Sequence, residues 1–306
     1  MDLMATYLGA FLHAILKFVQ RIYYGKGELE RLLTDSSKHT ILTTDMAGKL
    51  ILKSKVLSRG GVVDTMMLPR PYHVENLTMQ IIRLKKVRQN TSTYQIFKKN
   101  LSLSLKHLNG SRYALQTLNK LKNTKYDNKN AKHEETLYKL WHNLMGDTAL
   151  PARICTEWSE VGFQGTNPET DFRGMGYLGL FVLTSFSENN FSHTGDRARA
   201  ILNRSRGPAD NPLKFYPFAC AGIQITNFAL ELLRTRKLDR WFYELDTSAD
   251  SVSLDRNVLE IFVRLYAEMF EVLDICWAQG NPVNVMDFGR IFDDFKAKST
   301  ARLCSS

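Results

Sequence analysis

The segment TDFRGMGYLG, residues 170–179, brings one arginine and three glycines together at a spacing that phosphate chemistry could use. Gly174, Gly176 and Gly179 form G-x-G-x-x-G, which cradles a dinucleotide pyrophosphate when it follows a buried strand and opens a helix. Here the preceding residues, GFQGTNPETDF, are polar and rich in turn formers, and no second strand follows the apolar run YLGLFVLTSF. The glycines therefore do not predict a dinucleotide site.

Arg173 offers a different chemistry, because a guanidinium is a planar, permanently protonated group that stabilises charge developing on phosphate oxygens. Asp171 is expected to cap the first turn of a helix over 172–187. Each glycine inside that helix costs up to about 1 kcal/mol, which close contact with another helix or a partner's backbone would offset. A cation in a first helical turn is unfavourable as well. An internal ion pair of Arg173 with Glu169 or Asp171 therefore stays open as an alternative.

No other reactive site is indicated. The seven histidines show no paired ligand spacing, the four cysteines form no C-x-x-C pair, and no metal site is expected. The sequence contains neither a G-x-S-x-G nucleophile elbow nor a G-x-x-x-x-G-K-S/T phosphate loop. A nucleotide involved in the function would therefore belong to a partner, and the chain is expected to have no cofactor of its own.

The elements that must position Arg173 are predicted to be helical. Between 255 and 277, apolar residues recur every three or four positions in one stripe, as in an amphipathic helix. Alternating β-branched runs bounded by tight turns are nearly absent. The sequence thus predicts an all-α fold, a multi-helix domain with additional N-terminal helices. Further helices are expected over 74–89, 94–108, 111–122, 132–145, 172–187, 214–236 and 283–298.

Charge divides the chain of 306 residues unevenly. The net charge is +10, but residues 1–132 carry 23 Lys/Arg and 8 Asp/Glu, whereas 133–306 carry 18 and 23. Within 83–132 there are 13 basic residues and a single acid, Asp127. This range is interpreted first as a solvated helical face and second as a contact with an anionic membrane. Nucleic acid is not expected as a partner, because no base-reading module is recognisable.

Two further segments bear on the organisation of the chain. The polar stretch NTKYDNKNAK, residues 123–132, is interpreted as a solvated linker or loop. We therefore expect a basic helical N-terminal region over 1–130 and a second domain over 131–300. The apolar residues of 3–23 recur at helical spacing and predict an amphipathic helix that packs on the domain or lies on a membrane surface.

The residues around Arg173 resemble the ELMO domain family. The family signature W-x-x-x-G-F-Q-G, followed by P-x-T-D-F-R-G-x-G and then leucines, is present here without departure. The tight match covers about 158–180, and a looser one extends from about 130 to near 300. The matching residues are Trp158, Gly162, Phe163, Gln164, Gly165, Pro168, Thr170, Asp171, Phe172, Arg173, Gly174 and Gly176.

This resemblance implies a GTPase-activating protein for Arf-family or Arf-like small GTPases. Arg173 would be the catalytic arginine supplied to the GTPase, a residue that the adaptor branch of the family generally lacks. GTP and Mg²⁺ would be bound by the partner GTPase. The protein would be cytoplasmic, with peripheral contact to intracellular membranes through 3–23 and the basic 83–132 face.

Five neighbours complete the candidate site that the resemblance implies: Trp158, Gln164, Asp171, Gly174 and Gly176. The tryptophan is expected mainly to anchor the turn, and the glutamine either to cap it or to help present Arg173 to the GTPase. The aspartate is expected to orient the arginine, and the glycines to allow close approach of another surface.

A non-catalytic scaffold for a small GTPase or an exchange-factor complex is the alternative function. The two functions differ in what they require of Arg173. An accessible guanidinium would favour the activator, whereas a buried guanidinium engaged with Glu169 or Asp171 would favour the scaffold.

Overall fold

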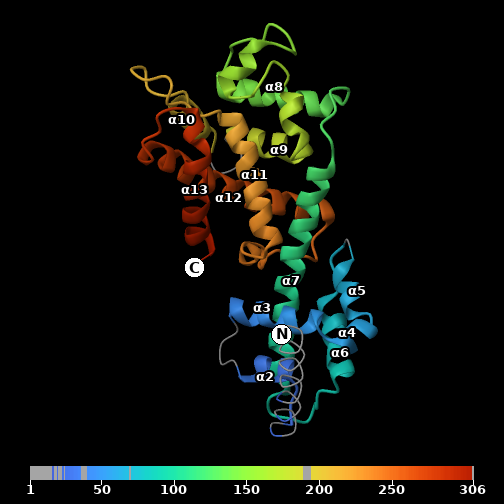
Figure 1. Ribbon diagram of the computed structural model, residues 1–306. Coiled ribbons are helices and arrows are strands. Elements are labelled where there is room, and N and C mark those ends of the chain that lie inside the picture. The colour runs from blue at the N-terminus through green and yellow to red at the C-terminus, as the bar shows by residue number, and fades with distance from the viewer. Residues whose placement is uncertain are drawn as a thin grey trace, which may run out of the picture. The chain divides into compact units, whose positions relative to one another are not determined.

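The computed structural model describes residues 16, 19, 23, 25–35, 40–68, 70–188 and 194–304. In this part of the chain every regular element is an α-helix or a short 3-10 helix, labelled η, and there is no strand (Figure 1). The predicted all-α fold is therefore confirmed. Most of the amphipathic helix expected over 3–23 lies outside the described residues. None of the described helices combines the length and the apolar character needed to cross a membrane.

The chain forms two compact units. The first comprises residues 1–113 and 243–248, and the second comprises residues 114–242 and 249–306. The division after Tyr113 lies ahead of the boundary expected near 130. The polar stretch 123–132 consequently belongs to the second unit.

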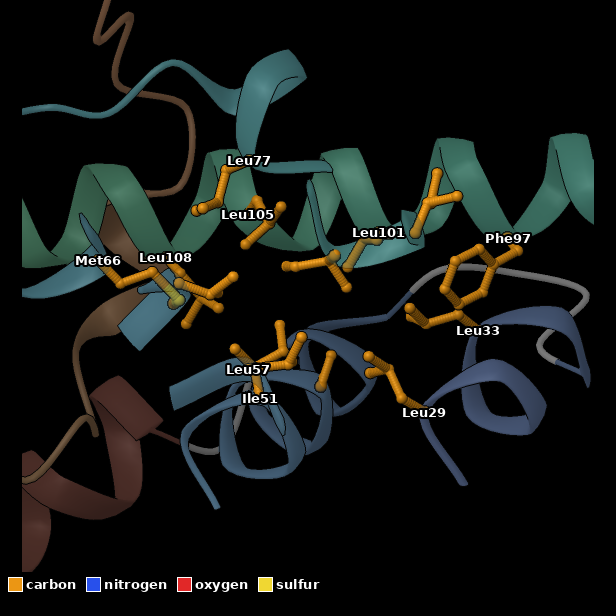
Figure 2. Packing of buried hydrophobic residues seen from close by; sticks show 14 of the residues in the cluster. Leu29, Leu33, Ile51, Leu57, Met66, Leu77, Phe97, Leu101, Leu105 and Leu108 are labelled. Carbon is orange, nitrogen blue, oxygen red and sulfur yellow. The ribbon is translucent and has the colours of Figure 1, made fainter. Parts of the chain in front are cut away.

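The first unit has its own apolar core, in which short helices pack against part of a long one (Figure 2). Leu33, Ile51, Leu57, Leu101 and Leu105 have no exposed surface. The helices of this unit are α2 (Glu28–Asp35), α3 (Ile41–Leu52), α4 (Lys55–Arg59), α5 (Val62–Met67), α6 (Val74–Lys85) and the first part of α7 (Tyr94–Asn123).

Residues 243–248 join the first unit through side chains of α7. The rings of His107 and Tyr243 stack with centroids 4.4 Å apart, and Asn109 Nδ2 donates a hydrogen bond to Thr247 Oγ1 at 3.1 Å. These contacts attach a segment distant in sequence to the core of this unit.

The second unit is built around α9 (Gly176–Ser187). Apolar residues surround this helix, and all of its residues except Phe181 are buried, as expected for a helix enclosed by others. α8, α10, α11 and α12 pack against it (Figure 1). The elements of the unit besides α9 and the end of α7 are α8 (Ala131–Met145), η1 (Thr156–Val161), η2 (Pro168–Arg173), α10 (Thr194–Ser205), α11 (Phe218–Arg234), η3 (Asp239–Phe242), α12 (Ser251–Gln279), η4 (Val285–Asp287) and α13 (Phe288–Cys304).

Several expected helix boundaries are wrong; the helix expected over 283–298, for example, is α13, which runs from Phe288 to Cys304. The helices expected over 94–108 and 111–122 form the single helix α7. Asn109, near the expected break, is buried and exchanges hydrogen bonds with the backbone of Tyr72 at 3.2 and 3.0 Å, so its amide does not form a local turn. The helix expected over 172–187 starts only at Gly176, because the residues before it form η2.

Candidate functional site

Arg173 is the last residue of η2, and its side chain is exposed. Its Nε donates a hydrogen bond of 2.8 Å to the carbonyl oxygen of Thr170. No carboxylate among the described residues forms an ion pair with the guanidinium, and neither terminal nitrogen has an acceptor among them. The backbone therefore holds the base of the guanidinium, and its two terminal nitrogens remain open to an anion from another molecule.

The helix that carries Arg173 differs from the prediction. It is a 3-10 helix that starts at Pro168, where the fixed φ of proline suits a first helical position, with Asn167 as its N-cap. Asp171 is therefore not an N-cap; its Oδ2 accepts a hydrogen bond from the backbone N–H of Gln164 at 3.2 Å. Arg173 ends this 3-10 helix and lies three residues before Gly176, the first residue of α9, so it is not in the first turn of a helix as expected.

One side of η2 packs against the segment that connects α7 and α8. A 3-10 helix has three residues per turn, so residues three apart share a side. Glu169 and Phe172 share the side toward this segment: the Phe172 ring lies 5.4 Å from the ring of Tyr126, and Asn128 Nδ2 donates a 3.1 Å hydrogen bond to Glu169 Oε2. Arg173 lies on the next side, which is exposed.

The remaining side of η2 carries Asp171 and faces the loop of Gln164, whose side chain is exposed. Burial raises the pKa of the Asp171 carboxyl, while the Gln164 N–H and the positive charge of Arg173 oppose the rise. Burial and the charge of Asp171 raise the pKa of the nearby Cys220 thiol to about 12. This thiol is thus neutral at physiological pH and is not a nucleophile.

Aromatic rings support η2 from inside. Trp158 has no exposed surface, and its ring packs edge-on against Trp141 and Phe163 with centroids 5.3 and 5.7 Å away. Phe163 lies in turn 5.7 Å from Phe172 of η2. The Trp158 Nε1 also donates a 3.0 Å hydrogen bond to the carbonyl oxygen of Arg153. Trp158 therefore has no surface to offer a partner, and it anchors the turn.

Arg153 is a supporting residue that the sequence pattern does not identify. Its Nε donates a hydrogen bond to Glu134 Oε2 at 2.7 Å, its Nη1 to Asn167 Oδ1 at 3.1 Å, and its Nη2 to the Tyr126 hydroxyl at 3.3 Å. One side chain thus connects α8, the segment before it and the N-cap of η2. An isolated arginine gives no periodic signal, and these contacts depend on the fold.

The glycines of the signature divide into two kinds. Gly162 and Gly176 have φ of +86° and +54°, and a Cβ at either would lie 2.3 or 2.2 Å from backbone atoms of α11 or α7. Gly165 and Gly174 are exposed, and a Cβ there would meet nothing within 4 Å. The close approach expected at Gly176 is therefore to the chain's own backbone. At Gly174 no described residue occupies the space that a Cβ would fill.

The arrangement offers one reactive group, a cation held on an exposed side of a short helix. The part of the chain that the structure describes contains no group of three or more His, Cys, Asp or Glu side chains that could hold a metal ion. The chemistry available at Arg173 is the donation of hydrogen bonds and positive charge to an anion brought by another molecule.

Comparisons with known proteins cover the whole of this site. The ELMO/CED-12 family matches residues 116–292. ELMO domain-containing protein 1 of Homo sapiens is 30% identical over 96% of this chain and 89% of its own length. ELMO domain-containing protein 2 of Homo sapiens is 31% identical over 95% and 92%, and ELMO domain-containing protein B of Dictyostelium discoideum is 29% identical over 94% of each chain. No solved structure matches the chain significantly. The chain therefore belongs to the ELMO/CED-12 family.

Proposed function

We propose that this protein is a GTPase-activating protein that binds GTP-loaded Arf-family or Arf-like small GTPases and places Arg173 beside the nucleotide phosphates. The observation that carries the proposal is the exposed guanidinium of Arg173, which forms no ion pair with a described residue. The signature around this arginine resembles that of the activating members of the family. This resemblance supports the same role for Arg173.

The chemistry accounts for an arginine at this position. During GTP hydrolysis, negative charge on the transferred phosphoryl group and the leaving oxygen must be stabilised in a site from which water is excluded. In well-studied GTPases an arginine supplied by a partner raises the rate by roughly 10³–10⁵-fold. The GTPase binds the GTP and Mg²⁺, and this protein contributes the planar donor group. A lysine has the charge but lacks the fork of donors.

The surroundings of Arg173 suit the approach of a partner. Gln164 is exposed on the loop that Asp171 holds against η2, so its amide is available to a surface that receives the arginine. Gly174 follows the arginine directly and leaves room for a partner's backbone. The scaffold alternative does not require a free guanidinium, and the accessible Arg173 favours the activator over it.

The test measures single-turnover GTP hydrolysis by a panel of GTP-loaded Arf-family GTPases with wild-type protein, Arg173→Lys and Arg173→Ala. We expect the wild-type protein to stimulate at least one GTPase and both variants to lose roughly 10³-fold of that stimulation. Binding of the GTPase and the thermal unfolding midpoint should persist, because the Arg173 side chain is exposed and makes a single hydrogen bond within the described residues.

Arg256→Lys is the matched control, since Arg256 is an exposed arginine of α12 without an ion pair to a described residue. This variant should stimulate hydrolysis as the wild type does. A wild-type protein that stimulates no GTPase of the panel, or an Arg173→Lys variant with full activity, would contradict the proposal. Tight binding of a GTPase without stimulation would favour the scaffold.

A further inference from the structure

Residues 120–132, here called the basic segment, contain five lysines and one acid, Asp127. The segment ends α7 and leads into α8. Lys125 and Lys129 are exposed, and neither forms an ion pair with a described residue. The carboxylate of Asp127 accepts a 2.9 Å hydrogen bond from the backbone N–H of Lys129. The segment therefore presents a net positive charge to solvent.

The basic segment is held against the elements that carry and follow Arg173. The backbone N–H of Tyr177, in the first turn of α9, donates a 2.8 Å hydrogen bond to the carbonyl oxygen of Thr124. A Cβ at Gly176 would lie 2.2 Å from the carbonyl oxygen of Lys122, so the backbones meet at a distance that only glycine permits. Asn128 and Glu169 form the hydrogen bond to η2 described above. The segment is thus part of the site and not a free linker.

The contacts of η2 place the stretch that carries Lys125 and Lys129 against the helix of Arg173. The basic segment packs along the side of Glu169 and Phe172, and Arg173 occupies the adjacent, exposed side of the same six-residue helix. Tyr126 and Asn128, which contact Phe172 and Glu169 of this helix, lie between Lys125 and Lys129 in the sequence. A protein that receives the arginine therefore comes within range of the charge on Lys125 and Lys129.

We infer that the basic segment is part of the docking surface for the GTPase and attracts an acidic protein surface next to the nucleotide. The inference rests on the proposed function. Lysine side chains at the edge of an interface act mainly on association, because they steer a partner of opposite charge before contact. Lys125 and Lys129 thus promote formation of the complex, while Arg173 acts on hydrolysis within it.

A protein surface fits these lysines better than a lipid surface does. The basic segment and Arg173 lie on neighbouring sides of η2, so a bilayer that covered the segment would compete with the GTPase for the same place. The remainder of the basic 83–132 range lies ahead of this segment in the sequence and stays available for the proposed membrane contact.

The experiment measures hydrolysis in solution, without vesicles, as a function of the concentration of wild-type protein and of Lys125→Glu/Lys129→Glu. We expect the double variant to raise the half-saturating concentration about tenfold and to leave the rate at saturation unchanged. The difference should shrink as the salt concentration rises from about 50 mM to about 300 mM.

A charge-matched double variant, Lys53→Glu/Lys55→Glu, changes two exposed lysines of the first unit that lie outside the basic 83–132 range. It should leave the half-saturating concentration close to that of the wild type. An equal effect of both double variants, or no effect of either, would overturn the inference. So would an effect of Lys125→Glu/Lys129→Glu that appears only when phosphatidylserine vesicles are added, which would assign the lysines to lipid.

Direct binding separates this inference from the proposed function. The affinity of GTP-analogue-loaded GTPase is measured for Arg173→Ala protein with and without the two lysine changes. About tenfold weaker binding on charge reversal supports the docking surface even if wild-type protein fails to stimulate hydrolysis. Unchanged affinity overturns it even if the stimulation is present.

Discussion

Asp171 couples the exposed arginine to the interior of the second unit. Its carboxylate accepts a hydrogen bond from the N–H of Gln164 and attracts Arg173, yet burial raises its pKa. Ionisation of this group at neutral pH therefore destabilises the folded state relative to the unfolded chain. A neutral side chain of the same shape would relieve that cost but would weaken the attraction on the guanidinium.

Asp171→Asn tests this balance through the dependence of stability on pH. The folded pKa lies above the unfolded one, so the stabilising effect of protonation is fully present below the unfolded pKa and is lost as pH rises through the folded pKa. We expect the wild type to gain stability relative to Asp171→Asn between about pH 7 and about pH 3.5. The gain should be under about 1 kcal/mol, because the group is half exposed. Urea unfolding of both proteins measures it, and a relative loss on acidification would contradict the prediction.

Arg153→Gln tests the support of η2. The change removes the ion pair with Glu134 and the hydrogen bond to the N-cap Asn167, and it should cost about 1–3 kcal/mol of unfolding free energy. We expect faster amide exchange over residues 168–174 and a lower saturating rate of stimulated hydrolysis, with GTPase affinity retained. When Arg173→Ala is already present, adding Arg153→Gln should not lower the saturating rate of hydrolysis any further.

The control for Arg153→Gln is Arg197→Gln. Arg197 forms ion pairs with Glu268 and Glu271 between α10 and α12 of the same unit, and these pairs are more exposed than the pair of Arg153 with Glu134. This variant should lose less stability and should not show faster exchange over residues 168–174. Equal exchange in the two variants would show that Arg153 supports the unit in general and not η2.

At the scale of elements, the two glycines on either side of Met175 are expected to have different roles. Gly176 is needed for packing within the chain, and Gly174 for the approach of a partner. Gly176→Ala places a Cβ against the backbone of α7 at a positive φ, so we expect a loss of at least about 2 kcal/mol of unfolding free energy. At Gly174 the backbone φ is −81°, which is helical, and a Cβ would lie in open space. Gly174→Ala should therefore change the free energy of unfolding by less than about 1 kcal/mol. If a partner's backbone approaches Gly174, this stable variant should still bind the GTPase more weakly. Chemical denaturation and affinity measurements distinguish the two effects, and unchanged affinity would exclude that approach.

Much of the helical architecture can be predicted from the sequence, because apolar spacing reports which side of a helix is buried. The stripe expected over 255–277 lies within α12. The start of α9 cannot be predicted in this way, since Asn167 and Pro168 begin a 3-10 helix by local geometry and the apolar pattern is silent there. The continuous apolar run also gives no sign of where α9 begins, because all residues of α9 except Phe181 are buried.

The candidate site shows the same limit. The arginine and its neighbours stand out from residue types and spacing alone, and so does the excess of glycine. Which glycines are required by the fold depends on backbone atoms far away in sequence, as for Gly176 and Lys122. The contacts of Arg153 and the place of the basic segment beside η2 likewise follow from packing between elements, which no local pattern contains.

At the scale of the whole molecule, the two units divide the chain's properties between them. The ELMO/CED-12 family match starts at residue 116, close to the start of the second unit, and includes all of the candidate site. The first unit has a separate apolar core and is more basic in sequence. Separate cores imply that each unit's stability depends chiefly on its own packing, although α7 contributes residues to both.

Two core truncations test whether the units are stabilised separately. Leu57 in α4 and Leu183 in α9 have no exposed surface, and each change to alanine should cost about 2–5 kcal/mol. We expect Leu57→Ala to raise native-state hydrogen exchange in α3–α6 while α9 and α12 keep their protection and stimulated hydrolysis persists. Leu183→Ala should raise exchange in α9 and α12 and lower the stimulation, because α9 follows and supports η2. Equal loss of protection in both units from either change would show one cooperative structure, in which the first unit contributes to the presentation of Arg173.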